Sequence, residues 1–342
     1  MDESPKITVA IPTYQGSRHL PEAIRGILLQ EGASYDLIIS DDQSDDETLE
    51  IARTLAGDRV RIQINSERLG LAGNWNQCVA LCRTPLIAIF HQDDRMEPGH
   101  LAAHVRAFDA NPDVGIVCSE ALVIDDQGQA VSETIVERSR IAPVDHRFEP
   151  GTFLSELLVR NPLRCSAVTL RKKAYEGAGG FDPSYRYVLD WDFWGRVAND
   201  WAVTWLARPT VSMRWHPASE THRFKVGTKD LEEIERLQSR LFERIESHEE
   251  RILSQKAAQR RLARAYLNRA HDCLGRGDST AARACLHRAV ALDRGILKTI
   301  ALDPRLALSM AALVAAPELT RRWYLRHRSS DLKNDPAISQ PV

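Results

Sequence analysis

The chain has little of what marks nucleic-acid-binding, secreted or membrane-embedded proteins. Its 342 residues carry a formal net charge of only −2, so we expect no nucleic-acid partner. The six cysteines are scattered through segments typical of buried strands and helices, which favours reduced thiols over a disulfide framework. The longest apolar run, residues 306–316, is shorter than the ~20 residues that span a bilayer. These features predict a soluble, folded protein.

The two ends of the chain bear on its location. The first residues are acidic and run directly into a strand, without the basic segment and apolar core of a signal peptide. A cytoplasmic location is therefore expected. Residues 321–328 mix arginines with Trp323 and Tyr324, a composition found in interfacial helices. An ordinary solvated helix is the favoured interpretation, and peripheral contact with the inner face of the membrane through the C-terminal helices is its alternative.

The first ninety residues alternate between short apolar strands and segments with helical spacing. The expected strands are 7–11, 37–40, 60–64 and 86–90, and the expected helices are 19–30, 48–55 and 72–82. Such alternation predicts an α/β fold with a mainly parallel sheet flanked by helices.

The sequence changes character near Thr228, where Gly and Pro thin out and apolar residues fall at helical spacing among charged ones. We therefore expect an α/β domain over residues 1–225 and an α-helical extension over 226–328. Residues 265–289 resemble one tetratricopeptide-like hairpin, which is too few repeats for a solenoid. Residues 329–342 are polar and aperiodic, so a disordered tail is expected.

Two acidic pairs follow predicted strands. Ligands of open α/β sheets bind beyond the carboxyl ends of the strands, so Asp41-Asp42 and Asp93-Asp94 are candidates for one shared cleft. A divalent cation that neutralises a diphosphate needs hard oxygen ligands, which Asp93-Asp94 can supply; the alternative is a turn that caps the next helix. Asp42 is a candidate to accept a hydrogen bond from a base N–H or a ribose hydroxyl. Ser44 or Asp45 is expected to cap the helix that follows.

Three further candidates lie later in the chain. Asp190 begins a probable helix and can be held there as a general base, whereas Asp192 beside the tryptophans is expected to bond structurally. Arg214 and His216 end a strand-like segment. Arg214 is a candidate to bind phosphate oxygens. His216 is a candidate ligand of a metal or a phosphate, although a lone histidine is usually structural.

Four motifs, in order, resemble those of the family 2 glycosyltransferases. They are Val9 to Tyr14, Ser40 to Thr48, Asn65 to Asn76 and His91 to Asp94, and two later blocks, Gly179 to Asp182 and Asp190 to Trp194, extend the resemblance over residues 5–222. It departs from the family pattern at Leu189, where Glu is frequent, and at Gln43, where Gly is frequent.

The resemblance implies a GT-A fold and an inverting transferase that uses a nucleoside-diphosphate sugar with Mg²⁺ or Mn²⁺. A UDP-sugar would be the favoured donor, and the acceptor a saccharide or lipid-linked hydroxyl in cell-surface polysaccharide or glycolipid assembly. By motif position it assigns Asp190 as catalytic base and Asp94 and His216 to the metal. The nucleoside would lie against Pro12, Thr13, Tyr14 and Asp42, and Asp93 would contact the ribose or the metal. Arg214 joins these nucleotide-sugar-binding residues as the candidate for phosphate oxygens described above.

Two other functions are weighed against this one. A sugar nucleotidyltransferase would need a Gly-rich, Arg-containing loop after the first strand, which residues 12–17 do not supply. A catalytically inactive scaffold with a helical interaction module would have lost acidic residues that this chain keeps.

Overall fold

The computed structural model describes residues 4–131, 140–216, 219, 224, 227–302, 307, 308, 310, 311 and 313. The chain forms two compact units, one of residues 1–219 with 243–247 and the other of residues 220–242 with 248–342. Residues 321–328 and 329–342, for which membrane contact and disorder were expected, lie outside the described part of the chain.

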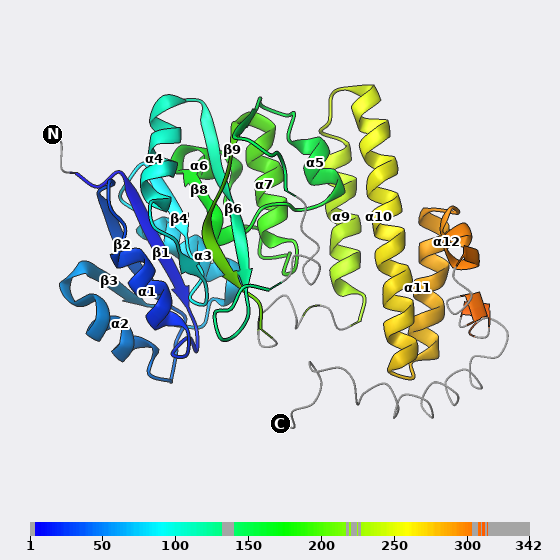
Figure 1. The fold of residues 1–342 in the computed structure, drawn as a ribbon, viewed down its shortest axis with the longest axis horizontal. Helices are drawn as coiled ribbons and strands as arrows, with labels where there is room; N and C mark the ends of the chain where they lie inside the picture. The colour runs from blue at the N-terminus through cyan, green and yellow to red at the C-terminus, as the bar shows by residue number, and fades with distance from the viewer. Residues whose placement is uncertain are drawn as a thin grey trace. The chain divides into compact units, whose positions relative to one another are not determined.

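A nine-stranded sheet forms the centre of the first unit (Figure 1). Its strands are β1 (Ile7–Thr13), β2 (Tyr35–Asp41), β3 (Val60–Ile64), β4 (Leu86–Ile89), β5 (Arg95–Met96), β6 (Val114–Ile124), β7 (His146–Phe148), β8 (Val168–Arg171) and β9 (Ala202–Arg214). They are ordered β3-β2-β1-β4-β8-β6-β9-β5, and β7 pairs with β9. The run β3-β2-β1-β4 is parallel, whereas β8 is antiparallel to both of its neighbours.

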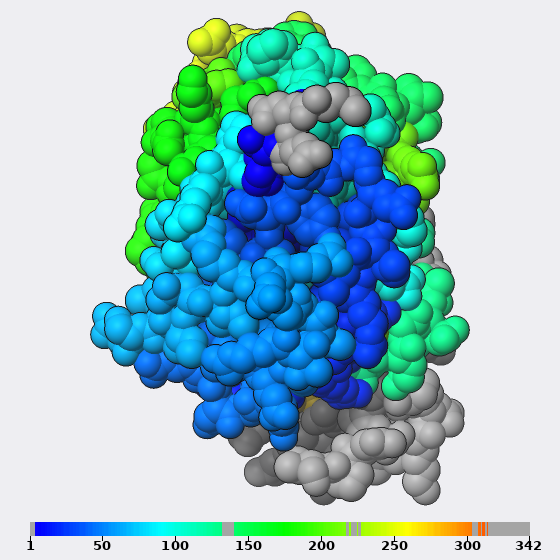
Figure 2. Space-filling model, turned by 90° about the vertical axis from the view of Figure 1, so that its left-hand side faces the viewer, coloured from blue at the N-terminus to red at the C-terminus, as the bar shows by residue number. Residues whose placement is uncertain are grey.

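Helices flank this sheet. They are α1 (Leu20–Leu28), α2 (Thr48–Ala56), α3 (Gly70–Leu81), α4 (His100–Ala110), α5 (Leu154–Val159), α6 (Lys172–Ala178) and α7 (Leu189–Asp200). Figure 2 views the unit from the β3 edge, where the blue N-terminal segments form the surface. The predicted fold class of a sheet flanked by helices is confirmed, and the antiparallel pairings of β5, β7 and β8 are what the alternation pattern did not predict.

Helix α1 shows how the pattern produces the packing. Leu20, Ala23, Ile24 and Ile27 follow the spacing of one helix face, and all four are fully buried. They join the side chains of β1, the central parallel strand, in the main core. Because β1 is hydrogen-bonded to β2 on one side and β4 on the other, the loops after these three strands meet at one edge of the sheet.

The second unit is helical. It contains α9 (Lys229–Phe242), α10 (His248–Gly275), α11 (Ser279–Leu292) and α12 (Ile296–Leu302). Gly277, at φ +79°, adopts the left-handed conformation common after a helix end, and Asp278 caps α11 by accepting from the N–H of Ala281 at 2.9 Å. A buried ion pair between Asp230 and Arg269 joins α9 to α10 at 2.6 Å. No helix in the described residues of either unit is long and apolar enough to cross a membrane.

Candidate active site

The loop after β1 is tied to the loop after β4 by one side chain. Gln92 accepts from the N–H of Tyr14 at 3.0 Å and donates to the carbonyl of Tyr14, also at 3.0 Å. A Cβ at Gly16 would lie 2.2 Å from Gln92 Oε1, so only glycine permits this approach. The loop predicted to hold the nucleoside thus lies against the loop that carries Asp93 and Asp94.

The first acidic pair organises the backbone. Asp41 accepts from Thr13 Oγ1 at 2.7 Å and from the N–H of Ser44 at 2.9 Å. Asp42 is only 2% exposed and accepts from the N–H groups of Leu69 and Gly70 at 2.7 and 2.9 Å. Asp42 therefore holds the N-terminus of α3, where the helix dipole favours a carboxylate.

The expected cap of α2 is wrong. Neither Ser44 nor Asp45 bonds to the start of that helix; Asp46 accepts from the N–H of Thr48 at 3.1 Å instead. Ser44 is used elsewhere, since its hydroxyl donates to Asp41 at 2.7 Å and accepts from the N–H of Gln15 at 3.0 Å. Gln15 Nε2 in turn donates to Asp45.

Arg68 is a candidate site residue that sequence reasoning missed. Its guanidinium lies 3.2 Å from the centre of the Tyr14 ring, and its Nε is 3.8 Å from Asp42 Oδ2. About half of the side chain is exposed, so a flat ligand on Tyr14 can displace or contact it. The signal available in the sequence was a cation within the third family motif.

The two carboxylates of the second acidic pair differ sharply. Asp94 is 3% exposed, and it accepts from Ser166 Oγ at 2.5 Å and from the N–H of Arg214 at 2.8 Å. Burial first, and then the charge of Asp93, raise the pKa of Asp94 to about 7. Asp94 therefore faces the protein interior.

Asp93 is the more accessible of the two. Its Oδ2 lies 2.9 Å from Nε2 of His216, and its side chain is 24% exposed. Burial alone would raise the pKa of Asp93, but the hydrogen bond from His216 and the charges of His91 and His216 outweigh it and lower that pKa. Asp93 Oδ2 and His216 Nε2, both potential metal ligands, thus lie side by side.

His91 completes a group that could hold a metal ion. Ligand atoms of His91, Asp93 and Asp94 all lie within 4.8 Å of one another, and the ring of His91 packs 5.3 Å from that of Trp75. Sequence reasoning quoted His91 as part of a motif without giving it a role. Oxygen and imidazole donors together suit Mn²⁺ and other transition metals.

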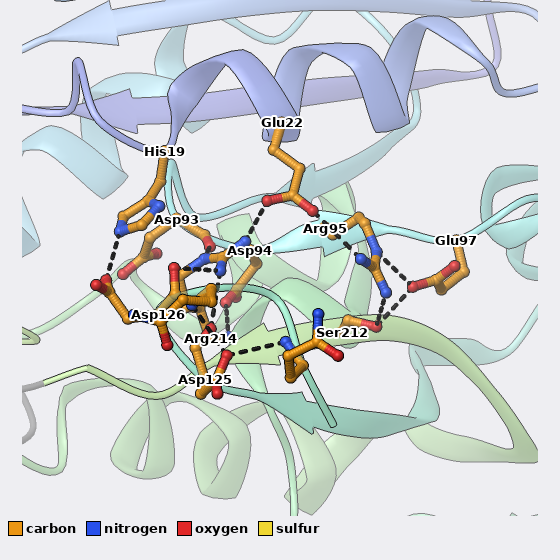
Figure 3. A network of polar contacts seen from close by, with 12 residues as sticks. His19, Glu22, Asp93, Asp94, Arg95, Glu97, Asp125, Asp126, Ser212 and Arg214 are labelled. Atoms are coloured by element: carbon orange, nitrogen blue, oxygen red, sulfur yellow. Dashed lines mark hydrogen bonds and ion pairs between the residues drawn. The ribbon is translucent and has the colours of Figure 1, made fainter. Parts of the chain in front are cut away.

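Arg214, predicted to bind phosphate oxygens, is buried within the protein. Its side chain is 1% exposed, and it donates to the carbonyl of Asp93 at 2.9 Å and to that of Asp125 at 2.8 Å (Figure 3). It also pairs with Glu22 of α1. A guanidinium engaged in this way is not free to contact a diphosphate.

Asp190 stands at the start of α7, as predicted. Its carboxylate accepts from Asn161 Nδ2 at 3.1 Å and from the N–H of Trp191 at 2.7 Å. Burial raises its pKa, although these hydrogen bonds act in the opposite direction. Burial lowers the pKa of His91, and the charges of Asp93 and Asp190 oppose that lowering, which places Asp190 near the second acidic pair. Asn161 is the second residue that sequence reasoning missed.

The region around α7 holds this carboxylate rigidly. Trp191 Nε1 donates to the carbonyl of Leu157 at 2.6 Å, and Phe193 and Trp194 are buried. Asp192 pairs with Arg196 at 2.8 Å, which agrees with the structural bonding expected of it.

Comparisons with known proteins identify the family. The profile described as Glycosyl transferase family 2 matches residues 8–156. An uncharacterised protein of Mycobacterium tuberculosis (strain CDC 1551 / Oshkosh) is 30% identical over 248 residues, which cover 68% of this chain and 74% of that relative.

Two solved structures share the fold. S. aureus TarS in complex with UDP-GlcNAc has a TM-score of 0.64 at 12% identity, covering 95% of this chain and 91% of that one. The mannosyltransferase PcManGT from Pyrobaculum calidifontis in complex with GDP-Man and Mn²⁺ has a TM-score of 0.57 at 17% identity, covering 95% and 86%. Their fold confirms the expected GT-A architecture, and the chain belongs to glycosyl transferase family 2 and is a glycosyltransferase.

Proposed function

We propose that the chain transfers a sugar from a nucleoside-diphosphate sugar, with a UDP-sugar as favoured donor, to an acceptor hydroxyl of a saccharide or a lipid-linked saccharide, with inversion at the anomeric carbon. The observation that carries the proposal is the convergence of Asp93 and His216, 2.9 Å apart, on a loop tied to the Tyr14 loop by Gln92. The nucleotide sugars bound by TarS and PcManGT support the donor class.

The nucleoside is proposed to lie on the loop after β1. The Tyr14 ring offers a face for base stacking, and Pro12 and Thr13, the last two residues of β1, lead into this loop. Arg68 is placed to meet the base or its ribose from the side. We propose that Asp42 acts indirectly, because its oxygens already accept from the start of α3 and lie near Arg68.

A divalent cation, Mg²⁺ or Mn²⁺, is proposed to bind Asp93 and His216, with His91 and Asp94 beside them. When bound, such an ion neutralises charge on the leaving diphosphate. A hydrogen bond joins Asp93 and His216, and a cation that bound both side chains would displace its proton. Asp94 and Arg214 are better suited to hold this loop than to contact ligands, which revises their assignment from the sequence.

Asp190 is proposed as the general base. It would take the proton of the acceptor hydroxyl as that oxygen attacks the anomeric carbon on the face opposite the departing nucleotide. Burial raises the pKa of Asp190, which makes its carboxylate a stronger proton acceptor than an exposed one. Asn161 would keep the carboxylate oriented, since its Oδ1 accepts from the N–H of Leu163 at 3.1 Å and its Nδ2 must then face Asp190.

The test combines binding with turnover. Calorimetry with UDP, GDP and dTDP in the presence of Mn²⁺ and then of EDTA should show metal-dependent binding of one nucleotide to the wild type, and Asp93→Asn should abolish the metal dependence. Asp190→Asn should bind that nucleotide normally while kcat falls roughly 10²–10⁴-fold. Asp200→Asn, at the exposed end of the same helix, is the matched control. Normal turnover by Asp190→Asn would refute the assignment of the base.

A further inference from the structure

One buried guanidinium connects four segments that are distant in the sequence. Arg214 Nε donates to the carbonyl of Asp93 at 2.9 Å, and Nη1 donates to the carbonyls of Asp125 and Asp126 at 2.8 and 3.2 Å. Nη2 donates to Glu22 of α1. Arg214 itself ends β9, so the loop after β4, the turn after β6, α1 and β9 meet on a single side chain (Figure 3).

The backbone of the same residue holds the other carboxylate of the pair. The N–H of Arg214 donates to Asp94 Oδ1 at 2.8 Å. The main chain is then fixed one residue further on, where the N–H of Trp215 donates to the carbonyl of Ile124 at 2.8 Å. His216 follows directly, so the position of its ring depends on this anchored strand end.

The contacts of the Arg214 guanidinium favour a structural role over ligand binding. Four of the five N–H groups of Arg214 are engaged, and its side chain is 1% exposed. Glu22 supplies the compensating charge and is itself held by Arg95 Nη1 at 3.2 Å. A buried arginine stripped of that partner would be strongly unfavourable.

We propose that Arg214, with its counter-ion Glu22, is a positioning residue that sets the separation of Asp93 and His216 and thereby the affinity of the metal site. The inference rests on the proposed metal-dependent function. Arg214 acts on both ligands at once, through the carbonyl of Asp93 and through the chain two residues before His216. Partners that orient metal ligands typically contribute about 10–100-fold in metal affinity or activity.

The test measures Mn²⁺ binding directly, by the loss of the free Mn²⁺ signal in electron paramagnetic resonance during titration of the intact chain. Arg214→Lys keeps the charge but loses the planar fork, and its Kd for Mn²⁺ should rise about 10–100-fold. Glu22→Gln should weaken binding in the same direction by a smaller factor. Glu97→Gln is the matched control, because Glu97 contacts Arg95 and Ser212 in the same network but neither Asp93 nor Asp94.

Thermal unfolding of each variant shows whether a loss of Mn²⁺ binding results from misfolding or from displaced ligands. If Arg214→Lys does not fold, the Kd of Glu22→Gln for Mn²⁺ provides the test. The apparent KM for Mn²⁺ should rise more than kcat falls at saturating Mn²⁺. If folded Arg214→Lys and Glu22→Gln bind Mn²⁺ as tightly as the wild type and Glu97→Gln, the positioning role is refuted. If the wild type itself binds no Mn²⁺, the proposed metal-dependent function is what fails.

Discussion

Acidification from pH 7.5 to 5 should destabilise the first unit through two buried histidines of α4. His100 and His104 are fully buried, and the centres of their rings lie 4.0 Å apart with the ring planes tilted by 41°. Nδ1 of His100 meets Thr210 Oγ1 at 2.7 Å and Nδ1 of His104 meets Thr169 Oγ1 at 2.9 Å. Neither Nε2 has a hydrogen-bond partner in the described residues, so a proton added there would be buried without compensation.

The magnitude follows from the shift at His100. Burial lowers its pKa from 6.5 to about 3, so between these values the unfolded chain binds a proton that the folded chain does not. The contribution of His100 to the free energy of unfolding is therefore fully present above pH 6.5. Below that pH it falls by about 1.36 kcal/mol per pH unit. At pH 5 the loss from His100 is about 2 kcal/mol. Burial and the neighbouring His100 also lower the pKa of His104, which adds in the same direction.

The assay is urea denaturation at both pH values, followed by tryptophan emission, since six of the seven tryptophans precede residue 220. Asp94 and Asp190, whose pKa values are raised, act in the opposite direction, so each variant is compared with the wild type at the same pH. His100→Asn should cost about 2 kcal/mol less at pH 5 than at pH 7.5. The exposed His146→Asn is the control. An equal cost of His100→Asn at both pH values would refute the reasoning.

Three further predictions concern the site. Asn161→Ala removes a hydrogen bond that lowers the pKa of Asp190, so the acidic limb of the kcat/KM profile should move to higher pH; an unmoved limb would separate Asn161 from the base. Tyr14→Ala should weaken nucleotide binding by about 1–3 kcal/mol through lost stacking, whereas Tyr14→Phe should bind nearly normally in calorimetry, and equal losses would argue against stacking. Gly16→Ala places a Cβ 2.2 Å from Gln92 Oε1, so the donor KM should rise with little change in the melting temperature. A wild-type donor KM in Gly16→Ala would show that the contact of Gln92 with the Tyr14 loop does not matter for donor binding.

Local sequence determined the order and nature of the elements over the first ninety residues. The strand 60–64 was predicted at its observed bounds, and the helix expected at 48–55 is one residue longer in the structure. The reason is that apolar spacing reports directly on which face of each element is buried. The rule that ligands bind beyond the carboxyl ends of the strands also brought Asp42 and the 91–94 loop together before any tertiary contact was known.

Tertiary structure alone decided what each polar residue of the site does. Asp93 and Asp94 are adjacent and chemically identical. Their carboxylates differ because Ser166 and the N–H of Arg214, 72 and 120 residues away from Asp94, donate to the side chain of Asp94, whereas Arg214 reaches Asp93 only at its carbonyl. The same contacts turn Arg214 from an apparent phosphate ligand into a buried link between segments. Asn161 carries no signal of its own, and Arg68 only that of a cation within a family motif, until the fold brings them to Asp190 and Tyr14. Such roles depend on long-range partners, whose positions no local pattern encodes.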